Sequence, residues 1–199
     1  MRSTPTISVS ALNPSINPDT RTVRRLSCPL GAYMLRVLSA VFLTLVLQSA
    51  SAETLLVSAK PGEFLANPIG NSAEIVKIST SFRLTTFDGS AAWPPAAYVG
   101  FFQGANRNES FQFLIIRNGG NAPFLTVGYR VIEEGKEKSA TSLASIPLDA
   151  SATVDLYFNK GIVTIRYGNQ TPITVKTRLT KATPYISVSS GSAQYKMLP

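Results

Sequence analysis

The stretch of residues 152–177, ATVDLYFNKGIVTIRYGNQTPITVKT, decides the fold class. Apolar and polar residues alternate along it, and two short polar segments that contain glycine interrupt it, at residues 159–161 and 168–169. Alternation with a period of two is typical of a half-buried strand, and a glycine-bearing corner between two such runs is typical of a hairpin. The stretch therefore predicts three strands in quick succession.

The same period of two occurs further towards the N-terminus. In residues 73–87, AEIVKISTSFRLTTF, one face of a long strand would carry Val76, Ile78, Thr80, Phe82 and Leu84. Residues 98–103 and 110–117 are apolar at successive positions, which indicates central strands covered on both faces. Residues 123–133 continue the pattern, and a Gly-Lys-Glu turn and a Ser/Ala-rich link follow.

The last predicted strands, residues 185–190 and 193–198, are joined through Gly191 and Ser192. In total we expect about nine or ten strands, with turns at the spacing of a sandwich or barrel. No segment after residue 52 has a sustained helical stripe. The predicted class is all-β, an antiparallel two-sheet β-sandwich (jelly roll), because open sheets of this size bury one face against another.

Three segments carry a resemblance to a known family: VGFFQGANRNESFQFLII (99–116), VDLYFNKGIVTIRYGNQTPITV (154–175) and ISVSSGSAQYKML (186–198). Over residues 82–199 the chain resembles the concanavalin A-like lectin/glucanase jelly roll, the group that includes laminin G-like domains. In that family the last strands commonly run through Ser-Gly and then an aromatic residue, as Ser190-Gly191 and Tyr195 do here. The resemblance implies a jelly roll and, as a function, recognition of glycans or cell-surface ligands.

Residues 53–199 contain neither cysteine nor histidine, since the single cysteine is Cys28 and the chain has no histidine. This composition excludes a disulfide framework, Ser-His-Asp and Cys-His triads, and zinc or copper sites built from imidazole or thiolate. We therefore expect neither a cofactor nor a metal of these kinds. The fold must be stabilised by packing and hydrogen bonds.

Half of the net charge of +8 lies in residues 1–52 and half in residues 53–199. Residues 53–199 hold fourteen Lys plus Arg and ten Asp plus Glu, which gives +4, and residues 1–52 hold five Arg and one Asp, which gives the other +4. No run of five or six like charges occurs. Nucleic-acid binding, which usually needs clustered phosphate contacts, therefore has little support.

Residues 34–56, MLRVLSAVFLTLVLQSASAETLL, have the pattern of a secretory signal. Arg36 precedes an apolar core at residues 37–47, and Ala50-Ser51-Ala52 provides the small residues of a cleavage site. The core is shorter than the roughly 17–25 residues that span a bilayer, and only Ser39 and Thr44 interrupt it, which disfavours a buried amphipathic helix. We predict a Sec-type signal at residues 34–52, cleaved after Ala52, a secreted or periplasmic protein, and no membrane span after cleavage.

Residues 1–33 are rich in Ser, Thr, Pro and Asn and lack hydrophobic periodicity, which predicts disorder. Either translation begins at Met34, or the five arginines and the single Asp19 mark a mitochondrial-type leader. The predicted organisation is an N-terminal extension (1–33), a signal peptide (34–52) and one β-sandwich domain (53–199).

Catalysis by the glucanase mechanism would need acids at alternate positions of one strand, such as Glu-x-Asp-x-Glu. The chain has no such motif: Glu133, Glu134 and Glu137 lie in a predicted turn, and Asp155 stands alone. Glycoside hydrolysis is the least favoured function, although other families place their two carboxylates far apart in sequence.

Ligand-binding candidates lie in two loops. Trp93 precedes two prolines and would either stack on a sugar ring or plug the end of the core. Asn106, Arg107, Asn108 and Glu109, in loop 103–110, would either hydrogen-bond a polyol or form an ordinary turn, and Asn106 with Glu109 would offer oxygen ligands to calcium.

Further candidates lie on strands. Gln112 and Arg117 follow the loop, and Tyr129 and Arg130 lie on the next strand; they would line a lectin-like groove or form a polar exposed face. The sequence favours a non-catalytic domain that recognises a carbohydrate or a cell-surface ligand. The alternative is a structural or assembly protein of the cell envelope that binds another protein through a sheet face or edge.

Overall fold

The computed structural model describes residues 53–87, 94–119 and 122–199, which belong to one compact unit and contain strands without helices. Trp93 and the predicted extension and signal (1–33 and 34–52) lie outside the described residues. In the described part no helix is long and apolar enough to cross a membrane. The strands are β1 (Thr54–Pro68), β2 (Ile75–Phe87), β3 (Ala96–Gln103), β4 (Glu109–Ile116), β5 (Phe124–Glu133), β6 (Lys136–Pro147), β7 (Ala152–Asn159), β8 (Ile162–Tyr167), β9 (Ile173–Lys176) and β10 (Thr183–Met197).

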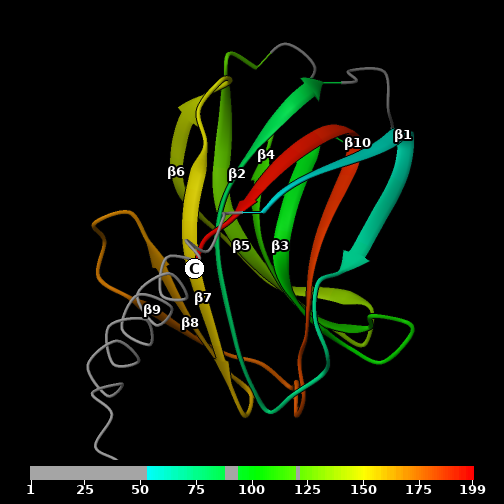
Figure 1. The fold of residues 1–199 in the computed structure, drawn as a ribbon, viewed down its shortest axis with the longest axis vertical. Helices are drawn as coiled ribbons and strands as arrows, with labels where there is room; N and C mark the ends of the chain where they lie inside the picture. Colours follow the sequence, from blue (N-terminus) through cyan, green and yellow to red (C-terminus); the bar gives the residue numbers. More distant parts are fainter. Residues whose placement is uncertain (1–52, 88–93, 120–121) are drawn as a thin grey trace, which may run out of the picture. The chain divides into compact units, whose positions relative to one another are not determined.

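The ten strands pair antiparallel throughout into one continuous sheet, which curls over at β10 into two layers, called here the first and the second sheet, that share this strand. Its first half pairs with β3 and its second half with β2, while β1 follows its other side through both halves (Figure 1). The first sheet therefore has the order β1-β10-β3-β4-β5-β6, and the second sheet has the order β1-β10-β2-β7-β8-β9.

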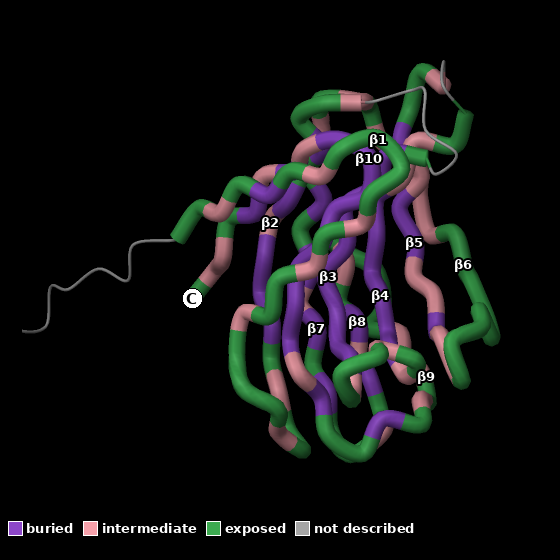
Figure 2. The backbone as a smooth tube through the Cα atoms, turned by 90° about the vertical axis from the view of Figure 1, so that its right-hand side faces the viewer, coloured by how far each residue is buried: buried purple, intermediate pink, exposed green. Residues whose placement is uncertain are grey.

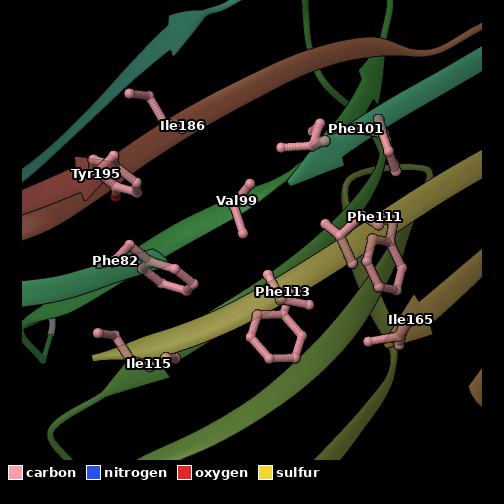
Figure 3. Packing of buried hydrophobic residues seen from close by; sticks show 14 of the residues in the cluster. Phe82, Val99, Phe101, Phe111, Phe113, Ile115, Ile165, Ile186 and Tyr195 are labelled. Carbon is pink, nitrogen blue, oxygen red and sulfur yellow. The ribbon is translucent and has the colours of Figure 1, made fainter. Parts of the chain in front are cut away.

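Aromatic side chains from the two sheets meet in a common core. The ring of Phe113 on β4 lies 6.1 Å from Phe82 on β2 and 5.5 Å from Tyr167 on β8, measured between centroids. Phe101 on β3 lies 5.7 Å from Phe158 on β7. Figure 3 shows Phe82, Phe101, Phe111 and Phe113 within this cluster. The two sheets thus pack face to face, and the predicted two-sheet β-sandwich is confirmed.

The passage of β10 from one sheet to the other takes place at Ser190 and Gly191. Both have positive φ angles, 51° and 131°. The Ser190 hydroxyl accepts a hydrogen bond of 2.9 Å from the backbone N–H of Gly62, which lies where β1 also loses its register against β10. A Cβ atom at Gly191 would lie 2.5 Å from the carbonyl oxygen of Thr86, so only glycine fits this corner.

The predicted alternation of residues 73–87 is confirmed, with Ile78, Phe82 and Leu84 buried in the core. The central strands β3 and β4 are buried on both faces, as their continuous apolar runs predicted (Figure 2). The predicted hairpin corners at residues 159–161 and 168–169 also lie between strands, after β7 and after β8.

Two predictions about the strands were wrong. Residues 185–198 do not form two strands with a turn, because the chain stays paired with β1 on both sides of Gly191, exchanges β3 for β2 there and continues as β10. The Ser/Ala-rich link is strand β6, which includes Glu137 and Lys138. β6 lies at the edge of its sheet with most side chains exposed, so no core contact imposes an apolar alternation on its sequence.

We expect Gly191→Ala to lower the free energy of unfolding by at least about 2 kcal/mol, because an added Cβ meets the Thr86 carbonyl at a positive φ. Gly168→Ala is the matched control, since Gly168 also has a positive φ, 57°, but no neighbouring atom within 4 Å, and should cost about 1 kcal/mol. Urea denaturation followed by far-ultraviolet circular dichroism measures both. Equal losses in the two variants would contradict the steric role of the corner.

Candidate functional site

The outer face of the first sheet, turned away from the core, carries several buried polar and aromatic side chains. Along β3, β4 and β10 the core-facing residues alternate with outward-facing ones, as in any strand. Pairing aligns the outward positions into rows, one of which runs through Tyr185, Gly100, Gln112 and Arg130. The buried outward-facing residues are Ala96, Tyr98, Gly100, Phe102, Ser110, Gln112, Leu114, Tyr185, Ser187 and Ser189.

Two adjoining hollows open on this face and share Ile116 and Arg130. One has a volume of ≈ 260 Å³ and is lined by Phe64, Pro94, Tyr98, Ile116, Arg130 and Ser189. The other has a volume of ≈ 200 Å³ and extends over β5 towards β6, where Glu137 lines it. We call the two together the Arg130 hollow.

Arg130 is held in place from three sides. Its Nε–H donates a hydrogen bond of 2.5 Å to the side-chain oxygen of Gln112, and its guanidinium carbon lies 5.1 Å from the centroid of the Tyr98 ring. Its Nη1 lies 3.7 Å from the carboxylate of Glu137. The side chain remains 30% exposed, so a guanidinium with a fixed orientation is presented to solvent at the centre of the hollow.

The floor beside Arg130 contains hydroxyl groups that are buried. The Ser189 hydroxyl lies 3.4 Å from the Tyr98 hydroxyl and donates to the backbone carbonyl of Pro94 at 3.0 Å. The Tyr185 hydroxyl lies beside the Gln112 amide without a hydrogen bond of good geometry, and the Ser187 hydroxyl also has no partner among the described residues. Burial raises the pKa of Tyr185 far above its ordinary value, so this phenol stays protonated.

The loop after β3 makes mainly structural contacts. The Glu109 carboxylate accepts a hydrogen bond of 2.9 Å from the backbone N–H of Glu134, and the backbone carbonyl of Asn108 accepts one of 2.9 Å from Gly135. Arg107 lies over the Phe102 ring, 5.3 Å from its centroid, and Asn106 is exposed. The structure thus ties the loop to the turn between β5 and β6. The described residues contain no group of three or more acidic, His or Cys side chains that could hold a metal ion.

Arg117 and Tyr129 point towards the core side of the first sheet. The Arg117 side chain donates from Nε to the carbonyl of Ala122 at 3.0 Å and stacks over Phe87, while the Tyr129 ring stacks on Phe111 at 5.9 Å. Of the residues predicted on strands, Gln112 and Arg130 lie on the outer face, Arg130 lines both parts of the hollow, and Tyr129 borders the part over β5.

Tyr98 and Phe64, which line the hollow, were not among the predicted ligand-binding residues. Tyr98 lies within an apolar run that reads as core, and Phe64 reaches the hollow through the pairing of β1 with Ser189 of β10. Arg130 was among the strand candidates, and the register pairs it with Gln112, but the side of the sheet that each residue faces was not evident from sequence.

No protein-family model matches the chain, and no curated protein matches it. Among solved structures, the carbohydrate-binding module CBM66 from Bacillus subtilis is similar over 74% of this chain and 94% of its own, with 9% identity and a TM-score of 0.50. A toad ovary galectin in complex with thio-digalactose covers 75% of this chain and 97% of its own, with 15% identity and a TM-score of 0.39. The similarity to the module shows a shared jelly-roll β-sandwich fold.

We expect stability to fall at alkaline pH because burial raises the pKa values of Tyr185 and Tyr195 in the folded protein. Above about pH 10 the unfolded chain releases these phenolic protons whereas the folded chain retains them, so the free energy of unfolding decreases as pH rises. An ultraviolet titration should show two tyrosines that ionise only on unfolding, and Tyr185→Phe should remove one of them. Ionisation of all tyrosines without unfolding would contradict this assignment.

Proposed function

We propose that residues 53–199 form an exported, non-catalytic carbohydrate-recognition domain that binds a glycan in the Arg130 hollow. The observation that carries the proposal is the guanidinium of Arg130, fixed between Gln112 and the Tyr98 ring in a hollow of mixed aromatic and polar lining. Ligand sites are typically hollows of this kind, in which a few oriented polar groups sit among apolar ones.

Phe64 and Tyr98 present aromatic surface at one side of the hollow, with their ring centroids 5.7 Å apart. The apolar face of a sugar ring packs against such surfaces, and Arg130 can donate hydrogen bonds to the sugar hydroxyls at the same time. The fold shared with a carbohydrate-binding module and the resemblance to concanavalin A-like lectins support the same ligand class.

The small number of carboxylates at the hollow favours binding of a glycan over its hydrolysis. Glu137 is the acidic side chain among its described lining residues, and it already approaches Arg130. Glycoside hydrolysis generally uses a pair of Asp or Glu residues, as acid and as nucleophile or base. The hollow therefore offers contacts for recognition without the paired acids of that mechanism.

One observation favours the alternative, an envelope protein that docks a partner chain. β6 is a twelve-residue edge strand with mostly exposed side chains, and in the described part no strand pairs with its outer side (Figure 2). An extended segment of a partner could add to this edge through backbone hydrogen bonds. A glycan array that stays silent while an envelope extract yields a stable partner would support this alternative.

We expect Arg130→Ala to weaken glycan binding by roughly tenfold or more, because a charge-assisted hydrogen-bond donor is removed from the hollow. Lys181→Ala is the matched control, since Lys181 is an exposed cation that lines neither part of the hollow. Isothermal titration with glycans selected on an array measures both. Unchanged affinity in Arg130→Ala would place the glycan elsewhere.

We also propose that the protein is exported and that signal peptidase cleaves after Ala52. Expression of the full chain should give a mature protein that begins at Glu53, and Ala52→Pro should block this processing because proline does not fit beside the cleavage site. N-terminal sequencing and mass spectrometry of the exported fraction measure the start. A mature protein that retains residues 34–52 would contradict the proposal.

A further inference from the structure

Most of the charged side chains on the outer face of the second sheet are positive. The alternation of β2, β7, β8 and β9 and the second half of β10 places their outward-facing residues on this face. A single acidic residue, Asp155, lies among them. The cations on the same strands and the same face are Lys77, Arg83, Arg166, Lys176 and Lys196.

This outer face accounts for the whole charge excess of the domain. Five cations less one acid give +4, which equals the net charge of residues 53–199, fourteen cations less ten acids. The remaining nine cations and nine acids of residues 53–199 balance. The positive potential of the domain is therefore concentrated on the outer face of the second sheet, which we call the basic face. The first sheet lies on the other side of the core.

At the centre of this face lies a hollow of ≈ 400 Å³, lined by Lys77, Asp155, Leu156, Tyr157, Thr164 and Arg166. Pairing places Lys77 next to Tyr157, Tyr157 next to Thr164, and Asp155 next to Arg166. The Tyr157 side chain is 42% exposed. None of the charged side chains that line the hollow forms an ion pair within 4.0 Å with a described residue, although Asp155 and Arg166 are cross-strand neighbours.

We propose that this face is a second binding site, separate from the Arg130 hollow, and that its ligand is an acidic polysaccharide with carboxylate-bearing sugar units. Lys77 on β2 is next to Tyr157 of β7, whereas Arg166 on β8 is next to Asp155, two residues away on β7, so the two cations lie diagonally across β7 at a lateral distance of roughly 10 Å. Two carboxylates along one polysaccharide chain can pair with these cations, and the sugar between them can pack against Tyr157 and bond Thr164.

Asp155 distinguishes a polyuronate from a nucleic acid at this site. Duplex DNA carries about one negative charge per 1.7 Å of its axis, so a phosphate would face the Asp155 carboxylate. A polysaccharide presents hydroxyl groups between its carboxylates, and a hydroxyl can donate a hydrogen bond to Asp155. The isolated acid therefore suits a polyanion with dispersed charges.

The test uses residues 53–199 and sodium alginate as the polyuronate probe, with dextran as a neutral probe, in affinity gel electrophoresis. Lys77→Ala with Arg166→Ala should weaken alginate binding by at least about tenfold. Lys136→Ala with Lys138→Ala, on the edge strand β6, is the control with the same change in net charge and should change the affinity less than about twofold. Equal losses in both double variants would overturn the proposal, because they would indicate a general charge effect.

Two further measurements complete the test. Tyr157→Ala keeps the charge and should still weaken alginate binding several-fold, whereas an unchanged affinity would overturn the role of the hollow. A duplex DNA probe that binds more tightly than alginate at equal salt would also overturn the proposal. Lys77, Tyr157 and Arg166 line no part of the Arg130 hollow, so a loss of alginate binding in their variants reports on the basic face whether or not the Arg130 hollow binds a glycan. Thermal unfolding confirms that each variant is folded.

Discussion

The two-sheet structure depends on one backbone constraint, the passage of β10 from the first sheet to the second at Ser190 and Gly191. The strand continues to pair with β1 across this point, so the same two chains join both sheets at one edge of the sandwich. A glycine at a φ of 131° allows the bend, and a serine hydroxyl at the bend accepts the hydrogen bond of the Gly62 N–H where β1 loses its register. The two halves of β10 place β3 and β2, from which the remaining strands of each sheet follow by pairing.

Because β10 pairs with β3 in the first sheet and with β2 in the second, it also aligns the side chains of the core. Tyr195, beyond the bend, stacks on Phe82 at 5.6 Å and donates from its hydroxyl to the backbone carbonyl of Ser187, before the bend. This contact fixes the angle between the two halves of the strand. The fully buried rings of Phe101, Phe111 and Phe113 then fill the space between the sheets.

The fold was largely predictable from the sequence because buried faces impose a pattern with a period of two, as in β2 and β7. β6 could not be predicted in this way, since an edge strand with exposed side chains has no buried face. The candidate site was less predictable. Arg117, just past the end of β4, lies five positions after Gln112 and therefore faces the opposite side, and only the structure shows that Gln112 is the one turned away from the core.

The absence of cysteine places the whole stabilisation of residues 53–199 on the core and the strand ladders. Residues that bind a ligand can therefore differ from those that stabilise the fold. The exposed charges on the outer face of the second sheet, such as Lys77 and Arg166, contribute little to packing. The Arg130 hollow is different: Tyr98 and Gln112 are nearly buried, so changes in their size act on the sheet as well as on a ligand. Ligand preference can therefore vary more freely on the basic face than in the Arg130 hollow.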